Sequence, residues 1–268
     1  KCLAPFFLGQ FEAGLDEHAD DFDVVLPLSL VGGNAGSRDA IVRVNRGIRD
    51  FVVETMGVAY APLVLCGDCL SAIGCLAGLE RTGARPSYLL WFDAHGDFHT
   101  DETTISGHLG GMALAMITGR GEQDILSRVG LAPFPEERIC HVGARDLEPG
   151  ERESLRRSAI ITVSRAAGAL DRIPRGSSVW VHFDTDYINP IDAPAMRYPA
   201  SGGPRALQVR TEFDVVARQL AVIGLSVSGW APHLDGVGRG SSTAEVCWKT
   251  LCAIRGLSSQ TIADSQRA

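Results

Sequence analysis

Short apolar runs alternate with segments of helical periodicity along most of this chain. We expect strands within residues 2–8, 61–66, 88–93, 138–142, 160–163, 178–183 and 222–227. Apolar residues at helical spacing predict helices at 39–58, 72–81, 110–118, 211–221 and 241–254, and one more that runs through Leu155. Asp39 is a candidate cap for the first of these helices. Strands that alternate with helices are typical of an α/β fold with a mainly parallel sheet covered on both faces.

The alternation continues along the chain without an internal repeat, a low-complexity stretch or a linker. We therefore expect one α/β domain over residues 1–268, a size that is ordinary for a single large domain of this class. A hydrophobic content of 45% is enough for a sizeable core. Residues 10–37, 98–108 and 189–204 are expected to be loops, and residues after Leu257 are expected to be loosely held.

Composition narrows the possible partners. The net charge of −7 argues against nucleic acid or an anionic membrane as a partner. No apolar run is long enough for a transmembrane helix. Lys1 and the apolar residues after it predict a first strand rather than a signal peptide, because Pro5 cuts the run short. Seven cysteines without paired spacing favour a reduced, cytoplasmic protein in which most thiols lie in the core.

Polar clusters follow the expected strands where these end. Asp93, His95 and Asp97 follow one apolar run, and Asp184 and Asp186 follow another with the same spacing of two. If the extended backbone continued past Asp93, alternate side chains would point the same way and the first cluster would converge. Carboxylates gathered at the carboxyl edge of a sheet repel one another unless a cation lies between them. The two clusters supply enough donors for two metal ions that activate water, and the alternative is an ordinary pair of solvated loops.

Five ordered motifs resemble those of the ureohydrolase superfamily, which contains arginases, agmatinases and formiminoglutamases. They lie between residues 65 and 205, and they read Gly-Asp-Cys-Leu-Ser from 67, Asp-Ala-His-Gly-Asp from 93, Ser-Gly-His-Leu-Gly-Gly-Met from 106, Gly-Ala-Arg-Asp-x-x-Pro-Gly-Glu from 143 and Asp-Thr-Asp-Tyr-Ile-Asn-Pro from 184. The resemblance implies a three-layer arginase-like fold around a parallel eight-stranded sheet. It also implies two manganese ions and a metal-bridging hydroxide that attacks a guanidino-type carbon.

Carried over by position, the resemblance gives a set of metal ligands. Asp93 and Asp184 would bridge both ions, and Asp97 would also hold the hydroxide. The full set of ligands is Cys69, Asp93, His95, Asp97, Asp184 and Asp186. Cys69 stands where the family has a ligand histidine, and its softer thiolate favours Zn²⁺ or Fe²⁺ over Mn²⁺. The alternative is that Cys69 packs as a small apolar residue and one metal position is weak.

The family's proton-shuttling histidine is also replaced. Its position is Gly110, while His108 and His99 stand where arginases carry substrate-contacting asparagines. Either imidazole is suited to act as an acid or base near pH 7, or to hydrogen-bond substrate. The alternative is that both are ordinary polar loop residues.

The substrate-holding positions are partly kept. Ser106, Glu148 and Glu151 fall where arginases contact the amino-acid end of the substrate. The glutamate that grips the guanidinium in arginases corresponds to Gly229, which puts ordinary arginase or agmatinase activity in doubt. Cys69 and the missing shuttle histidine match a subgroup that resembles N-omega-hydroxy-L-arginine amidinohydrolases.

Three hypotheses follow. The first is a metal-dependent hydrolase of carbon–nitrogen bonds in linear amidines, with a small guanidino or amide compound as substrate and with Asp97, His108 and His99 as candidate catalytic residues. The second is a catalytically altered member that binds a metal or a metabolite. The third is a deacetylase-like amide hydrolase with a single zinc ion. The family resemblance further implies a trimer or hexamer.

Overall fold

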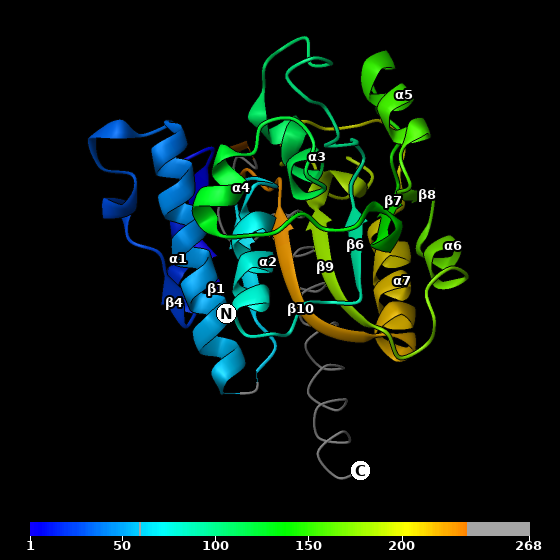
Figure 1. The fold of residues 1–268 in the computed structure, drawn as a ribbon, viewed down its shortest axis with the longest axis horizontal. Coiled ribbons are helices and arrows are strands. Elements are labelled where there is room, and N and C mark those ends of the chain that lie inside the picture. Colours follow the sequence, from blue (N-terminus) through cyan, green and yellow to red (C-terminus); the bar gives the residue numbers. More distant parts are fainter. Residues whose placement is uncertain (59, 235–268) are drawn as a thin grey trace.

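A central sheet of eight strands organises the computed structural model, which describes residues 1–58 and 60–234 (Figure 1). The strands lie in the order β4 (Val24–Val25), β1 (Cys2–Ala4), β5 (Leu63–Cys66), β10 (Ala221–Ser228), β9 (Ser178–Asp184), β6 (Tyr88–Phe92), β7 (Ile139–Val142) and β8 (Ile161–Val163). Every neighbouring pair in this sheet is parallel. A separate antiparallel hairpin joins β2 (Phe6–Phe7) to β3 (Gln10–Phe11).

Helices cover both faces of the sheet, so the molecule has three layers. On one face lie α1 (Arg38–Gly57), α2 (Ser71–Arg81), α3 (Ala113–Ile117) and α4 (Asp124–Val129), and on the other α6 (Ala166–Leu170) and α7 (Ala206–Gln219). Successive strand residues point to opposite faces, so β6 gives Leu89 and Trp91 to one core and Leu90 and Phe92 to the other. The expected α/β class and the eight-stranded, helix-covered sheet are confirmed.

The first two helices pack against each other, and α2 begins directly after the loop that carries Cys69. Ser37, not Asp39, caps α1, because its hydroxyl accepts from the Ala40 backbone N–H at 3.1 Å. The two helices pack against each other over much of their length (Figure 1). Gly74 permits this close approach, since a Cβ there would lie 2.4 Å from the Asn45 carbonyl oxygen. The loop that precedes α2 is tied to the end of the first hairpin strand, because the Leu8 backbone N–H donates to Asp68 Oδ2 at 2.7 Å.

Several expected boundaries differ from the structure. The run from Cys2 is interrupted at Pro5 and becomes two short strands, while the edge strand β4 and the helices α4 and α6 were not expected. Helix α7 begins at Ala206, five residues earlier than expected, and Gln208 Oε1 accepts from the Arg205 backbone N–H at 2.9 Å at this end. The helix α5 (Pro149–Arg157) confirms the one expected through Leu155. The helix expected at 241–254 lies outside the described residues.

Within residues 1–58 and 60–234, no helix combines the length and apolar character needed to cross a membrane.

Candidate metal centre

The polar clusters meet in one cavity at the carboxyl ends of five neighbouring strands. This cavity has a volume of about 410 Å³ and is bordered by the segments that follow β5, β10, β9, β6 and β7. Every site residue expected from the sequence lines it, namely Cys69, Asp93, His95, Asp97, His99, Ser106, His108, Glu148, Glu151, Asp184 and Asp186. The loop order of a parallel sheet thus brings together residues that lie up to 117 positions apart in the chain.

The segment from Asp93 to Asp97 converges by turning rather than by continuing the strand. The His95 backbone N–H donates to Asp93 Oδ1 at 2.7 Å, which folds the chain back just after β6. Asp97 has a left-handed backbone with φ of +50°, a costly conformation for a residue with a side chain. Its carbonyl oxygen accepts from the backbone N–H groups of Leu114 and Ala115 at 2.9 and 3.1 Å. The condition of an extended backbone past Asp93 is therefore not met, although the three side chains do reach one cavity.

The second cluster is tied to the first by hydrogen bonds. Asp184 ends β9 and accepts the Asp186 N–H at 2.9 Å, which forms a tight turn. Asp186 then accepts from the Ala94 N–H at 3.0 Å and lies 2.8 Å from His95 Nδ1. Because β6 and β9 are neighbours in register at Phe92 and Phe183, Asp93 and Asp184 emerge side by side.

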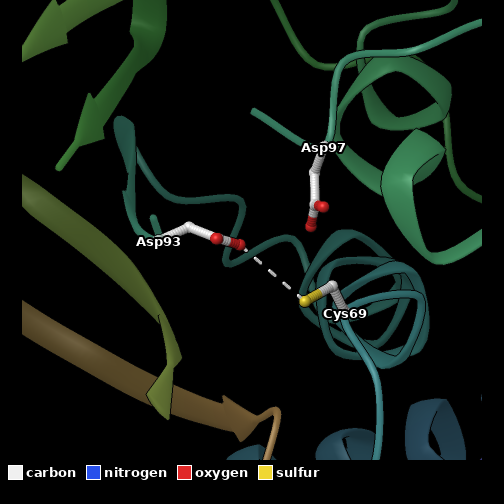
Figure 2. A group of neighbouring side chains, drawn as sticks. All are labelled: Cys69, Asp93 and Asp97. Carbon is white, nitrogen blue, oxygen red and sulfur yellow. Dashed lines mark hydrogen bonds between the residues drawn. The ribbon is translucent and has the colours of Figure 1, made fainter. Parts of the chain in front are cut away.

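Cys69 reaches the same place from the loop between β5 and α2. Figure 2 shows its sulfur pointing toward Asp93 and Asp97. The Sγ atom lies 3.1 Å from Asp184 Oδ2 and 4.0 Å from Asp93 Oδ2. The thiol therefore faces the carboxylates rather than the apolar core.

Two sets of donor atoms are each close enough to surround one cation. One set is Cys69, Asp93 and Asp97, and the other is Asp93, His95 and Asp186. Asp93 belongs to both, as expected for a carboxylate that bridges two ions. Asp184 belongs to neither set, although it lines the same cavity and contacts the Cys69 sulfur. Its bridging role stays a prediction.

The electrostatics of these groups fit a cation. Burial raises the pKa of Asp97 well above its usual range, and the charges of Asp93 and Asp184 raise it further. Burial together with the charge of Asp186 raises the pKa of Asp184 to about 7, and burial together with Asp93 raises that of Asp186 to about 6. The pKa of the Cys69 thiol is raised by burial and by the surrounding carboxylates. A divalent ion would remove this mutual repulsion.

One oxygen in the cluster marks where such a cation fits. Asp97 Oδ2 is buried, and it has no hydrogen-bond partner among the described residues. A buried carboxylate oxygen without a partner is costly, and a metal ion or its bound water would satisfy it. The donor set of carboxylates, one imidazole and one sulfur suits a divalent transition metal.

One wall of the cavity is acidic. His99 lies 3.4 Å from Glu148 through Nε2, while its Nδ1 lies 3.1 Å from Thr103 Oγ1. Glu151 accepts the Phe98 N–H at 3.0 Å, and burial raises the pKa of its carboxyl group. Glu148 remains half exposed at the cavity mouth. This wall suits a positively charged end of a ligand.

Another part of the cavity lining is built around His108. An added Cβ at Gly110 would lie only 2.6 Å from His108 Cε1, so the imidazole fills the space that a side chain at 110 would use. The Tyr198 hydroxyl lies 3.2 Å from His108 Nε2. Burial and the charge of Arg197 lower the pKa of His108, which keeps the imidazole largely neutral near pH 7.

Gly229 lies directly after β10 and faces Asp184. It adopts a left-handed backbone with φ of +79°, and an added Cβ would lie 2.0 Å from Asp184 Oδ1. A longer side chain at 229 would therefore collide with a candidate ligand in this backbone arrangement. No carboxylate occupies this position to grip a guanidinium.

Three further cavity residues, Phe7, Arg197 and Tyr198, belong to no motif quoted from the sequence. Arg197 and Tyr198 lie in the Pro- and Gly-rich loop at 189–204, and the length of that loop was the only signal that it borders a site. The guanidinium of Arg197 stacks 4.1 Å over the Phe7 ring and pairs with the buried Glu12.

Comparisons with known proteins agree with this geometry. The model of the Arginase family matches residues 17–253. An arginase from Brucella melitensis is 30% identical over 213 residues, which are 74% of this chain and 68% of the relative. The N(omega)-hydroxy-L-arginine amidinohydrolase of Streptomyces lavendulae is 29% identical over 216 residues, 79% of this chain and 71% of that protein. The crystal structure of an arginase from Bacillus cereus shares the fold with a TM-score of 0.78 at 23% identity, covering 95% and 96% of the two chains.

Proposed function

Since this chain belongs to the arginase family, we propose that it is a metal-dependent hydrolase of a carbon–nitrogen bond in a linear amidine. The observation that carries this proposal is the pair of donor sets that share Asp93 inside the cavity. Mn²⁺ is the metal expected from the family, and the sulfur of Cys69 makes Zn²⁺ or Fe²⁺ the alternatives. Divalent cations held there would acidify water, so that hydroxide is available as a nucleophile near neutral pH.

The chain's own residues account for the steps around that nucleophile. Asp97 Oδ2, which is buried and lacks a protein partner in the described part of the chain, is placed to accept a hydrogen bond from the attacking water. In the reaction, the oxygen adds to the amidine carbon, the bond to the leaving nitrogen breaks, and that nitrogen takes a proton. His108 is the preferred carrier of this proton, because its neutral imidazole beside Gly110 can take the proton that the attacking water gives up and pass it to the leaving nitrogen. His99, Ser106, Glu148 and Glu151 would bind the rest of the substrate.

The substrate is expected to differ from ordinary arginine. Gly229 supplies no carboxylate to the cavity, so a strongly basic guanidinium lacks a charge-assisted partner at this position. A less basic amidine, such as a hydroxylated guanidino group, needs that partner less and releases a more weakly basic nitrogen. A small guanidino-type amino acid with a modified head is therefore the class of substrate that we propose.

The glycines at positions 229 and 110 favour a second candidate function. Without a carboxylate for the guanidinium at 229 and without a side chain at 110, the protein would bind a metal and a metabolite but would not turn the metabolite over.

A substrate panel separates the two. The metal-loaded protein is incubated with L-arginine, agmatine, N-omega-hydroxy-L-arginine and formimino-glutamate, and release of urea or its equivalent is measured with D93N as control. Metal-dependent turnover of the hydroxylated compound that D93N abolishes supports the hydrolase. Stoichiometric binding of metal and ligand without turnover of any compound supports the binding protein and contradicts the proposal.

A further inference from the structure

A chain of buried hydrogen bonds lies directly beneath the candidate metal centre. The Trp180 indole N–H donates to Ser226 Oγ at 3.0 Å, and Ser226 Oγ lies 2.8 Å from His182 Nδ1. His182 Nε2 lies 3.2 Å from Ser228 Oγ, which donates to Asp184 Oδ2 at 2.9 Å. Trp180, His182, Ser226 and Ser228 are all fully buried. The chain therefore connects the interior of the sheet to a candidate ligand without water.

Strand register explains why these side chains meet. Ser226 pairs with His182, and Ser228 pairs with Asp184, between β10 and β9. Alternate residues of a strand share a face, so all four point to the side of the sheet that carries the candidate ligands. Polar residues in strands buried on both faces cost free energy unless they are bonded. Their place directly below the cavity indicates a role in the site.

The donors and acceptors fix the direction of this chain. An ionised carboxylate only accepts, so Ser228 gives its single hydrogen to Asp184 Oδ2 and accepts from His182 Nε2. A neutral imidazole has one N–H, so His182 Nδ1 is an acceptor and takes the hydrogen of Ser226. Ser226 in turn accepts from the indole N–H of Trp180, which is only a donor.

Cys69 joins the end of this chain. Its sulfur lies 3.1 Å from Ser228 Oγ and 3.1 Å from Asp184 Oδ2. One hydroxyl therefore accepts from a thiol and donates to a carboxylate that come from different segments of the chain. We propose that Ser228 is a positioning residue that aims the Cys69 sulfur and the Asp184 carboxylate at the same cation, with its hydroxyl aligned by Trp180, Ser226 and His182. The inference rests on the metal centre of the proposed function.

The proposal explains how a cysteine works in a cluster of oxygen donors. A thiol that only packed against the core would need no aligned hydroxyl beside it. Partners that orient metal ligands typically change metal affinity by about 10–100-fold when they are removed.

Cobalt is the probe for this inference, because a Co²⁺–thiolate bond gives a near-ultraviolet charge-transfer band that does not depend on turnover. Apo protein is titrated with Co²⁺ in the wild type, S228A, H182F and T185V. Thr185 is the matched control, because it is buried beside Asp184 and its hydroxyl has no hydrogen-bond partner among the described residues. Circular dichroism and the Tm in EDTA check that each variant folds.

We expect S228A to bind Co²⁺ about 10–100-fold more weakly and to lose or shift the sulfur band, and T185V to match the wild type. H182F should change both readouts in the same direction, and adding it to S228A should have no further effect, because His182 acts through Ser228. H182F alone decides the question if S228A does not fold. A wild-type band and affinity in the folded variants overturn the inference and leave the metal centre intact. A wild type that binds no Co²⁺ contradicts the proposed function, and the inference fails with it.

Discussion

Gly229 allows a sharp test of the way the structure holds Asp184. The change to alanine adds one methyl group, which in the present arrangement would lie 2.0 Å from Asp184 Oδ1, where ordinary contact begins at 3.4 Å. Either the carboxylate or the backbone after β10 must move by more than an ångström. Metal–ligand distances tolerate only about 0.2 Å. We therefore expect G229A to weaken divalent metal binding by about 10–100-fold.

The backbone contributes a second, separable effect. Alanine in a left-handed conformation costs about 1–2 kcal/mol, which lowers the Tm by roughly 2–8 °C in a chain of this size. Gly176 is the matched control, because its φ of +77° is nearly that of Gly229 and an added Cβ there would meet no described atom within 4 Å. G176A should lose stability alone, whereas G229A should lose stability and metal affinity.

The assay combines thermal unfolding in EDTA with isothermal titration of Mn²⁺ into apo protein at pH 8. The prediction fails if G229A binds Mn²⁺ like the wild type, or if G176A loses affinity to the same extent.

Three further predictions concern charge and proton transfer. D97N should raise the Tm of the metal-free protein at pH 8, because burial and neighbouring carboxylates raise the pKa of Asp97 and make its charged form unfavourable. The same substitution should weaken Mn²⁺ binding. Thermal melts with and without Mn²⁺ check these opposite effects on the Tm. H108N should lower kcat about 10²–10⁴-fold at unchanged metal stoichiometry, while H99N should mainly raise KM. Equal effects of the two variants on kcat would count against His108 as the residue that delivers the proton. H141F tests pH dependence at a buried histidine that does not line the cavity. Burial lowers the pKa of His141 from 6.5 to about 4, so between these values the unfolded chain binds the extra proton and stability falls as the pH falls. Replacing His141 with phenylalanine should reduce the slope of unfolding free energy against pH by about 1.4 kcal/mol per pH unit between pH 4 and 6.5. Chemical denaturation at several pH values measures this slope. An unchanged slope in H141F would contradict the prediction.

The ligand-bearing strands could be predicted from the sequence because they are long apolar runs that end abruptly in acids. The run from Tyr88 to Phe92 and the run from Ser178 into Asp184 have this form, and parallel topology then places their ends together. The edge strand β4 consists only of Val24 and Val25, a run too short to predict a strand. Helix α6 has five residues, too few for a periodic pattern.

The environment of the site was harder to predict, because it depends on pairing between distant segments. His182 and Ser228 lie 46 positions apart and meet only through the register of β9 and β10. The way His108 fills the space beside Gly110 depends on a turn and not on spacing. An extended backbone was the condition on which Asp97 was reasoned to converge, whereas its conformation is left-handed and its carbonyl oxygen accepts from the backbone of α3. Tertiary contacts decided each of these features.

Anomalous diffraction from crystals grown with Mn²⁺ is the most direct test of a two-ion centre in this cavity. We expect two peaks in each chain, one within bonding distance of Cys69, Asp93 and Asp97 and the other within bonding distance of Asp93, His95 and Asp186. A cavity without anomalous density at saturating Mn²⁺, or a single ion that does not contact Asp93, would contradict the two-ion centre.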